Sequence, residues 1–242
     1  MVRTVHRMLR AIVVLTLIAA MGLMVFALTR SRPQDLPWTA LDLAHPVGLF
    51  TGRKLAGLTE DGARCKALLD KAGVDYVALP PLEGPRCGYD DAVRLQPADD
   101  QLAYRPADVA PSCPVAAALK LWEWNVLQPA AHEIFGKPVK EVTHFGSYSC
   151  RRLYGREEGD YSEHATADAI DISGFVLTDG TRITIMNDWN EETGKTRFLH
   201  RIRDEACSLF STVLSPDYNA AHADHLHLDQ AERGALGWRA CR

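Results

Sequence analysis

The sequence lacks an excess of positive charge. Its 27 Lys and Arg residues are outnumbered by 31 Asp and Glu residues, and the formal net charge is −4. Proteins that bind nucleic acids usually carry a concentrated basic surface. We therefore expect no nucleic-acid partner.

The chain also lacks internal repeats and low-complexity tracts, which excludes a repeat protein and a largely disordered one. Hydrophobic residues make up 47% of its 242 residues. A chain of this length and composition can bury the core of one large domain or two small ones.

The sequence also lacks the pattern of a cysteine-based zinc site, because no two of its six cysteines form a Cys-x-x-Cys pair. An even number of scattered cysteines, all after the N-terminal segment, indicates an oxidising compartment and disulfides. The pairing is open from sequence, and we expect neighbours in chain order to pair: Cys65 with Cys87, Cys113 with Cys150, and Cys207 with Cys241.

The N-terminal segment contains an uncharged run from Ala11 to Leu28, preceded by three arginines. The run is long for a signal-peptide core and is at the lower end of what spans a bilayer as a helix. It passes directly into Thr29-Arg30-Ser31-Arg32 without a small-x-small cleavage site. We therefore expect residues 1–30 to form an uncleaved signal anchor. Because arginines flank the run on both sides, the cysteines decide the orientation: an inner-membrane protein with its C-terminal domain in the periplasm.

Residues 31–50 carry three prolines and are interpreted as a linker, followed by one domain over 51–242 whose motifs lie within 113–241. Its expected fold class is α+β: a small antiparallel sheet that carries the site, with packed helices. Hydrophobic periodicity predicts helices over 59–73, 113–135 and 195–214, and strands over 74–79, 139–149, 169–176, 182–186 and 225–228. Asp179-Gly180 predicts a hairpin, and residues 80–111 predict irregular structure with a short strand at 92–95.

Two short stretches in the last third of the chain, 162–171 and 222–227, carry the chemistry. Residues two apart in a strand share a face, so His225 and His227 should project together while the leucines beside them face the core. Two imidazoles on one face of a buried strand are costly unless something pairs with them. The same alternation isolates Asp171 on the opposite face from its isoleucine neighbours.

A catalytic zinc usually takes three nitrogen or oxygen ligands from the protein and leaves a fourth position for water. His164, Asp171 and one histidine of the second stretch would make such a set, and Zn²⁺ is the expected cofactor. Asp168 and Asp229 flank the stretches and are interpreted as solvated acids that could also orient a ligand imidazole. The other histidines occur singly and are interpreted as surface or hydrogen-bonded residues: His6, His45, His132, His144 and His200.

The pattern His-x6-Asp followed by His-x-His resembles that of the zinc peptidases that cut bacterial cell-wall peptides, a group of D-Ala-D-Ala carboxypeptidases, dipeptidases and murein endopeptidases. Their first motif is usually Ser-x-His-x-x-Gly-x-Ala-x-Asp, and this chain departs from it with Ala167 in place of the glycine. The wider stretch 113–241, including Gly146-Ser147-Tyr148-Ser149-Cys150-Arg151 and Tyr218-Asn219, more closely resembles the bacterial extensin-like C-terminal domain. That domain is itself similar to the zinc peptidases.

The resemblance implies three zinc ligands, His164, Asp171 and His227. It implies that Arg151 binds substrate or a developing oxyanion. The implied substrates are peptidoglycan peptides, cleaved at a D,D or L,D bond.

The resemblance also implies catalytic residues around the ligands. His225 would lie beside the metal without binding it, and His222 matches a further active-site histidine. Asp224 stands where the dipeptidases have a glutamate as general base, so the base is left open between Asp224, His225 and His222.

Two hypotheses of different kinds follow. The first is a membrane-anchored zinc hydrolase acting on peptidoglycan peptides. The second is a non-catalytic envelope protein that keeps the fold to bind cell-wall peptide, which Ala167 and the missing glutamate favour. A purely structural metal site is a third reading, and it is the weakest because a closed site more often uses four ligands, including cysteine.

Overall fold

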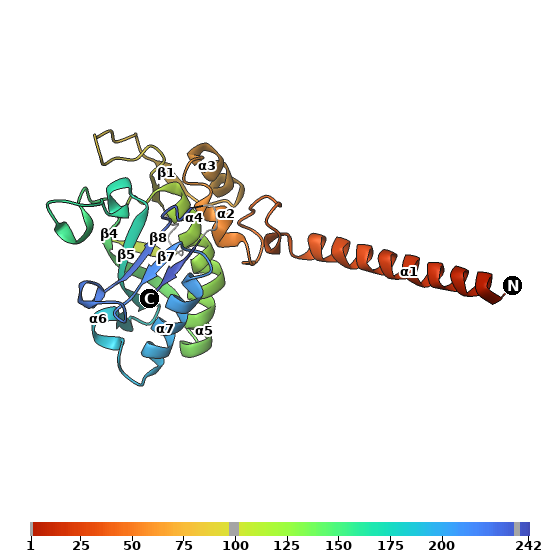
Figure 1. Cartoon of the computed structure of the whole chain (residues 1–242). Helices are drawn as coiled ribbons and strands as arrows, with labels where there is room; N and C mark the ends of the chain where they lie inside the picture. The colour runs from red at the N-terminus through yellow and green to blue at the C-terminus, as the bar shows by residue number, and fades with distance from the viewer. Residues whose placement is uncertain (1, 97–101, 235–237) are drawn as a thin grey trace.

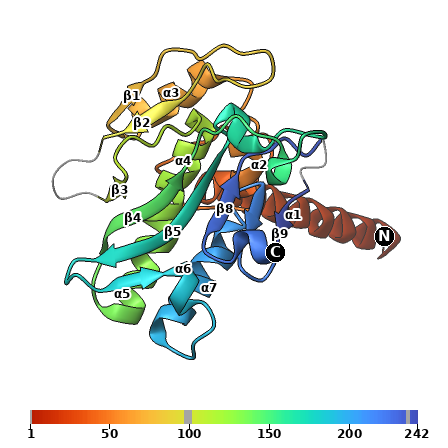
Figure 2. The same cartoon turned by 90° about the vertical axis from the view of Figure 1, so that its left-hand side faces the viewer.

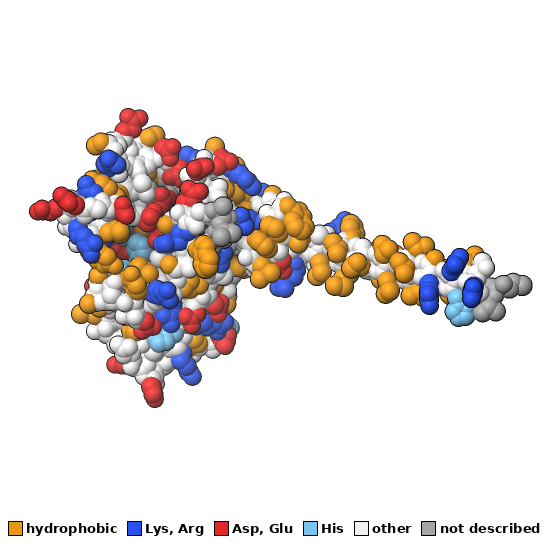
Figure 3. All heavy atoms as spheres, in the orientation of Figure 1, with side chains coloured by type: hydrophobic (Ala, Val, Ile, Leu, Met, Phe, Trp, Pro, Cys, Tyr) orange, Lys and Arg blue, Asp and Glu red, His pale blue; other side chains and the backbone are white. Residues whose placement is uncertain are grey.

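A computed structural model describes residues 2–96, 102–234 and 238–242. The first helix, α1 (Val2–Ser31), extends away from the rest of the molecule (Figure 1), and its described side chains are exposed except for the half-buried Thr29. It is long and apolar enough to cross a membrane. Figure 3 shows hydrophobic side chains along most of α1 and Lys, Arg and His side chains near its N-terminal end. These features agree with the expected membrane anchor.

The domain is mixed α and β, as predicted, but its main sheet is larger than the small antiparallel sheet that was expected. It has seven strands in the order β3-β4-β5-β8-β7-β9, with β6 paired to β5. The β3–β4 and β7–β9 pairs are parallel and the others are antiparallel. The strands are β3 (Ala103–Arg105), β4 (Val139–Gly146), β5 (Ala169–Leu177), β6 (Arg182–Thr184), β7 (Thr212–Leu214), β8 (Leu226–Asp229) and β9 (Ala240–Cys241).

Besides β7, which falls in a predicted helix, two of these strands were not predicted, because β3 and β9 have only three and two residues. Segments this short carry no alternation that a sequence pattern can detect. They form because the edges of the longer strands β4 and β7 offer unpaired backbone groups to whichever segment passes beside them.

One face of the sheet is covered by helices that run through α4 (Cys113–Trp122) and α5 (Gln128–Phe135), with α7 (Gly194–Ala206) beside them (Figure 2). The predicted helix over 113–135 is confirmed, with a π-helical turn (Glu123–Leu127) just before Pro129. Proline has no backbone N–H to donate within the helix, and a π turn alters the hydrogen-bonding pattern at this point. The helix ends at Gly136, which has a positive φ of 66°.

The predicted helix over 195–214 is too long, since α7 ends at Ala206 and residues 212–214 form β7. Apolar residues continue at helical spacing through Phe210, which explains the overestimate. Thr212 and Val213 are β-branched and pair with β8, so tertiary pairing decides the strand. The hairpin at Asp179-Gly180 is confirmed, although β6 gives way after Thr184 to a short helix, α6 (Ile185–Asp188).

A second layer lies at one end of the sheet and contains α2 (Thr51–Ala56), α3 (Gly62–Lys71) and the two-stranded sheet of β1 (Tyr76–Ala78) and β2 (Val93–Leu95). Part of the stretch interpreted as a linker packs against this layer. Leu41 and Leu43 are buried in the core, and the 3₁₀ turn η1 (Pro33–Asp35) follows α1 directly.

The disulfides correct the expected pairing at two of three positions. The bonds are Cys65–Cys113, Cys87–Cys150 and Cys207–Cys241. Cys65 on α3 meets the first residue of α4 because these two helices pack together, and pairing follows spatial rather than chain proximity. The second bond fixes the residue before Arg151, so it bears directly on the candidate site.

Asp91 gives a prediction about stability. Its carboxylate accepts a hydrogen bond from the Cys113 N–H at the start of α4 (3.3 Å). Burial, together with the negative charge of Asp168, raises the pKa of Asp91 to about 6. The pKa of Asp91 is about 3.8 in the unfolded chain and about 6 in the folded one. The folded protein therefore loses stability as the pH rises from about 3.8 to about 6, because the buried carboxyl must ionise. Asp91→Asn should therefore raise the free energy of unfolding at pH 7 by about 1–2 kcal/mol.

Thermal unfolding of the full chain at pH 7 and pH 4.5 would check this prediction. The gain should shrink at the lower pH, because the wild-type carboxyl is then protonated. Asp90→Asn, at the exposed neighbouring position, should change stability by less than about 0.5 kcal/mol. A loss of stability in Asp91→Asn at pH 7 would show that the charge of Asp91 is favourable.

Candidate metal centre

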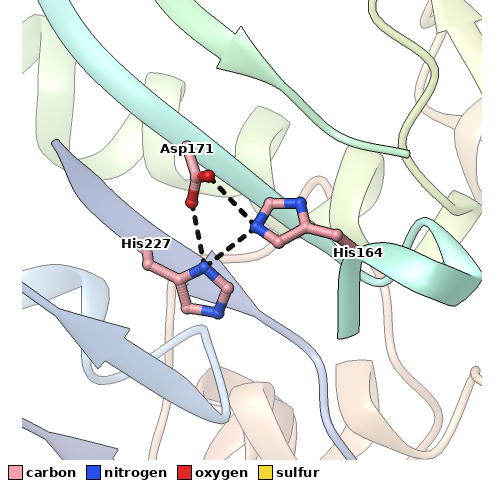
Figure 4. Close-up of side chains that lie close together, drawn as sticks. All are labelled: His164, Asp171 and His227. Carbon is pink, nitrogen blue, oxygen red and sulfur yellow. Dashed lines mark hydrogen bonds and ion pairs between the residues drawn. The ribbon is translucent and has the colours of Figure 1, made fainter. Parts of the chain in front are cut away.

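The three predicted ligands come from three segments that the sheet brings together. Asp171 on β5 lies directly opposite His227 on β8 in the antiparallel ladder. His164 lies on the 3₁₀ turn η4 (Glu163–Thr166) that leads into β5. The leucines flanking His227 on β8 are fully buried in the core, as the strand alternation predicted. All three ligand-type side chains are buried and point toward one another (Figure 4).

The turn that carries His164 begins at a capping serine and ends at a residue in the left-handed conformation. The Ser162 hydroxyl accepts a hydrogen bond from the His164 N–H (3.4 Å), and the turn ends at Ala167 with φ 62°. A positive φ favours glycine, because it places a Cβ close to the backbone at a cost of about 1–2 kcal/mol. This is the position at which the resembling peptidases have glycine. The chain therefore keeps the left-handed turn despite its alanine.

The ligand-type atoms are close enough to hold one ion. Nε2 of His164 lies 3.2 Å from Nδ1 of His227 and 3.1 Å from Oδ2 of Asp171. Nδ1 of His227 lies 2.9 Å from Oδ1 of Asp171. Ligands placed about 2.0–2.1 Å from a tetrahedral zinc are separated by about 3.3 Å. The spacing and the donor types therefore fit a zinc ion with three protein ligands.

The remaining imidazole nitrogens have acceptors on the outside of the site. Nδ1 of His164 donates to the backbone carbonyl of Ser147 (2.6 Å), so Nε2 would be the atom that binds a metal. Nε2 of His227 donates to Oδ2 of Asp229 (3.1 Å), so Nδ1 would be the atom that binds a metal. Ser147 is itself fixed by its hydroxyl, which donates to the Ala169 carbonyl on β5 (2.6 Å).

Electrostatics in the cluster are strongly coupled. Burial alone would raise the pKa of Asp171, but hydrogen bonds from His164 and His227 hold it well below its usual range. Burial alone would lower the pKa of His227, but its bonds to Asp171 and Asp229 raise it to about 9. Burial and the nearby His225 and His227 lower the pKa of His222 to about 4. Asp171 is therefore ionised, His227 protonated and His222 neutral at pH 7, and metal binding at His227 would release its Nδ1 proton.

The sequence-predicted catalytic residues lie next to the ligands. Nε2 of His225 is 3.5 Å from Oδ1 of Asp171, and its Nδ1 donates to Oδ1 of Asp224 (2.8 Å). Asp224 thus contacts His225 and is itself about half exposed. Nη2 of Arg151 lies 3.8 Å from Oδ2 of Asp171, with half of the arginine side chain exposed.

His222 completes this group, because its ring centre lies 5.1 Å from that of His225. The side-chain oxygen of Asn219 accepts a hydrogen bond from Nδ1 of His222 (2.8 Å), so Nε2 is its free acceptor. Exposed aromatic side chains border the two histidines: the ring of Tyr218 is tilted against that of His222, and the ring of Phe145 meets that of His225 edge to face.

Asp229 differs from its prediction. The sequence favours a solvated acid over one that orients a ligand imidazole, whereas Asp229 is buried and accepts a hydrogen bond from His227. Its position two residues after His227, on the same face of β8, was the available signal. Asp168 is only half-buried, and its backbone carbonyl accepts the N–H of Gln230. Ser147 acts through its backbone carbonyl, which no side-chain pattern reveals.

Asp229 leads to a prediction about metal affinity. Removing the acceptor with Asp229→Ala should weaken zinc binding by roughly 10–100-fold, because the tautomer and orientation of His227 are then no longer selected. Competition with a chromophoric chelator would measure the change. Asp229→Asn keeps an acceptor oxygen and should lose less affinity. Equal affinity in the wild type and Asp229→Ala would contradict the orienting role.

Comparison with known proteins agrees with the sequence motifs. The family described as "Extensin-like protein C-terminus" matches residues 63–242, which is most of the chain and includes the whole candidate metal centre. No curated protein and no solved structure matches the chain. The matched segment runs from α3 to the last residue. The chain therefore belongs to the extensin-like C-terminal family.

Proposed function

We propose that the protein is a membrane-anchored zinc hydrolase that acts on peptidoglycan peptides in the periplasm. The observation that carries the proposal is the convergence of three buried ligand-type side chains, His164, Asp171 and His227, with His225 and Arg151 beside them. A three-ligand set is typical of catalytic zinc, whereas structural zinc usually has four ligands. The substrate class follows from the resemblance to cell-wall peptidases.

Zinc, when bound by these ligands, would supply Lewis acidity toward a peptide carbonyl and make water more acidic. The chain's own residues would handle the protons. His225 is held through Nδ1 by Asp224, so its Nε2 is free to accept a proton and return it to the leaving amine. His222 is neutral at pH 7 and offers Nε2 as a second acceptor.

Arg151 would bind negative charge at the edge of the site. Its guanidinium is half exposed and close to Asp171, and the Cys87–Cys150 disulfide anchors the residue before it. A guanidinium can hold a substrate carboxylate by two hydrogen bonds or stabilise a developing oxyanion. Both roles suit a peptide substrate that ends in a free carboxylate, cleaved at a D,D or L,D bond.

A second candidate function is binding of cell-wall peptide without hydrolysis. Asp224 favours it, because this acid is paired with His225 and is about half exposed, whereas the resembling dipeptidases have a glutamate there as base. The same metal ligands and Arg151 would then serve recognition alone.

Incubation of the full chain in detergent with purified muropeptides, with and without a chelator, tests the proposal. We expect chelator-sensitive product formation, and product masses would identify the bond that is cut. A zinc-loaded protein that binds muropeptides but releases no product would favour the binding function instead.

The proposed location gives a further prediction. The cysteines should be oxidised and the C-terminal domain should lie outside the cytoplasm, because all six cysteines form disulfides in the structure. A reporter enzyme that is active only after export should be active when it is fused after Arg242. Six reactive thiols after denaturation without reductant, or a reporter active only in the cytoplasm, would contradict this topology.

A further inference from the structure

A cavity separate from the candidate metal centre lies between α2 and the C-terminal segment. Its volume is about 180 Å³, well above the roughly 15 Å³ that admits one water. Three arginines are among its lining residues: Arg53 on α2, and Arg233 and Arg239 on the segments before and after residues 235–237. Trp238 forms part of the wall and is 72% exposed. The proposed hydrolysis uses none of these residues.

Two of the arginines are fixed by hydrogen bonds that use only part of each guanidinium. Nη1 of Arg239 donates to the backbone carbonyl of Cys207 (2.9 Å), and the disulfide from Cys207 to Cys241 holds that chain segment in place. Nε of Arg233 donates to the Thr212 hydroxyl on β7 (3.1 Å). The geometry positions the guanidinium groups without neutralising them.

Arg233 and Arg239 carry the positive charge on which the proposal rests, and neither forms an ion pair with a described carboxylate. Within residues 2–96, 102–234 and 238–242, no carboxylate lies within 4 Å of the guanidinium nitrogens of Arg233 or Arg239, and Glu232 is the one acidic residue among the lining residues. Gly52 makes room for the group: a Cβ there would overlap the guanidinium of Arg239 and lie 2.5 Å from the Ser208 carbonyl. Space and positive charge are therefore both provided.

The cavity is close to the end of the membrane-spanning helix. Lys54, next to Arg53 on α2, donates to the Pro33 carbonyl (3.3 Å) of the turn that follows α1. Figures 1 and 2 both show α2 near the base of α1. An exposed tryptophan beside basic residues is typical of the headgroup region of a membrane. Anionic headgroups of a bilayer would lie within reach of this face.

We propose that this cavity binds a phosphate group, supplied by an anionic phospholipid headgroup or by a soluble phosphate compound. Arginine guanidinium groups match the oxygens of phosphate in pairs of parallel hydrogen bonds. With a lipid as the source, the bound headgroup would hold the domain against the membrane and so limit its reach into the cell wall.

Titration of the full chain in a phosphate-free maltoside detergent tests this site with two probes, inorganic phosphate and dioctanoyl phosphatidylglycerol. We expect saturable binding that is weakened about 10–100-fold in the double variant Arg233→Gln/Arg239→Gln, because charge-assisted hydrogen bonds are lost. Gly52→Ala keeps every charge but displaces Arg239, and it should also weaken binding. The matched control Arg182→Gln/Arg197→Gln removes two exposed arginines elsewhere and should change binding less than about twofold.

The two probes separate the sources of phosphate. Saturable binding of the lipid without inorganic phosphate binding identifies a headgroup site, and comparable binding of both identifies a site for soluble phosphate. Equal weakening in the pocket and control variants would reduce the effect to net charge and overturn the proposal. Absence of saturable binding for both probes would also overturn it.

Discussion

We expect the wild-type protein to take up one equivalent of zinc, and we expect His227→Ala to abolish this binding. His164→Ala and Asp171→Ala should do the same, because each side chain supplies one of three mutually close ligand atoms. A catalytic zinc usually needs three protein ligands, so the two that remain in each variant should be too few to retain the ion. Metal content after dialysis, measured by elemental mass spectrometry, would check the result.

His132→Ala provides the matched control, because this histidine is exposed on α5 and lies outside the cluster. It should retain a full equivalent of zinc. Circular dichroism would show whether each variant remains folded. Full zinc content in His227→Ala would contradict the assignment and make His225 the next candidate, since its Nε2 already lies 3.5 Å from Asp171.

The second large effect is expected in His225→Ala, where the hydrolase and the binding protein differ. His225 is beside the ligands, with Asp224 bonded to its outer nitrogen. In a hydrolase, the variant should keep its zinc and lose hydrolysis of muropeptides by roughly 10²–10⁴-fold, the usual contribution of a general acid–base group. In a binding protein, the wild type and the variant would be equally inactive.

Comparison with Asp224→Asn shows whether His225 or Asp224 carries the proton. If His225 is the proton carrier and Asp224 only orients it, Asp224→Asn should lose less activity than His225→Ala and shift the pH profile of kcat. Undiminished hydrolysis in His225→Ala with full zinc content would refute the role of His225. The base would then be Asp224 or His222.

Local patterns in the sequence predicted much of the fold. The apolar run of α1, the helix from Cys113 to Gly136 and the hairpin at Asp179-Gly180 depend on composition, capping and turn chemistry, which neighbouring residues determine. The alternation around Asp171 and His227 predicted which face of each strand would join the hydrophobic core. The opposed register of these two residues agrees with that alternation.

Other features depended on which segments meet in space. The pairing of Cys65 with Cys113 follows from the packing of α3 on α4, and β3 and β9 exist only as partners of longer strands. The end of α7 was misjudged because apolar spacing continued past it, while pairing with β8 favoured a strand. In each case a long-range contact outweighed the local preference.

The candidate site shows the same division. By itself, the sequence determined the side chains that can bind zinc and the short spacings that place them on a turn and two strands, because donor chemistry and strand alternation are local properties. Only the tertiary structure decided that His164, Asp171 and His227 converge. It also decided that Asp229 and the Ser147 carbonyl bind the outer imidazole nitrogens, and that arginines gather near the base of α1. Those arrangements join residues distant in the chain, so they arise only when the sheet and its covering helices pack together.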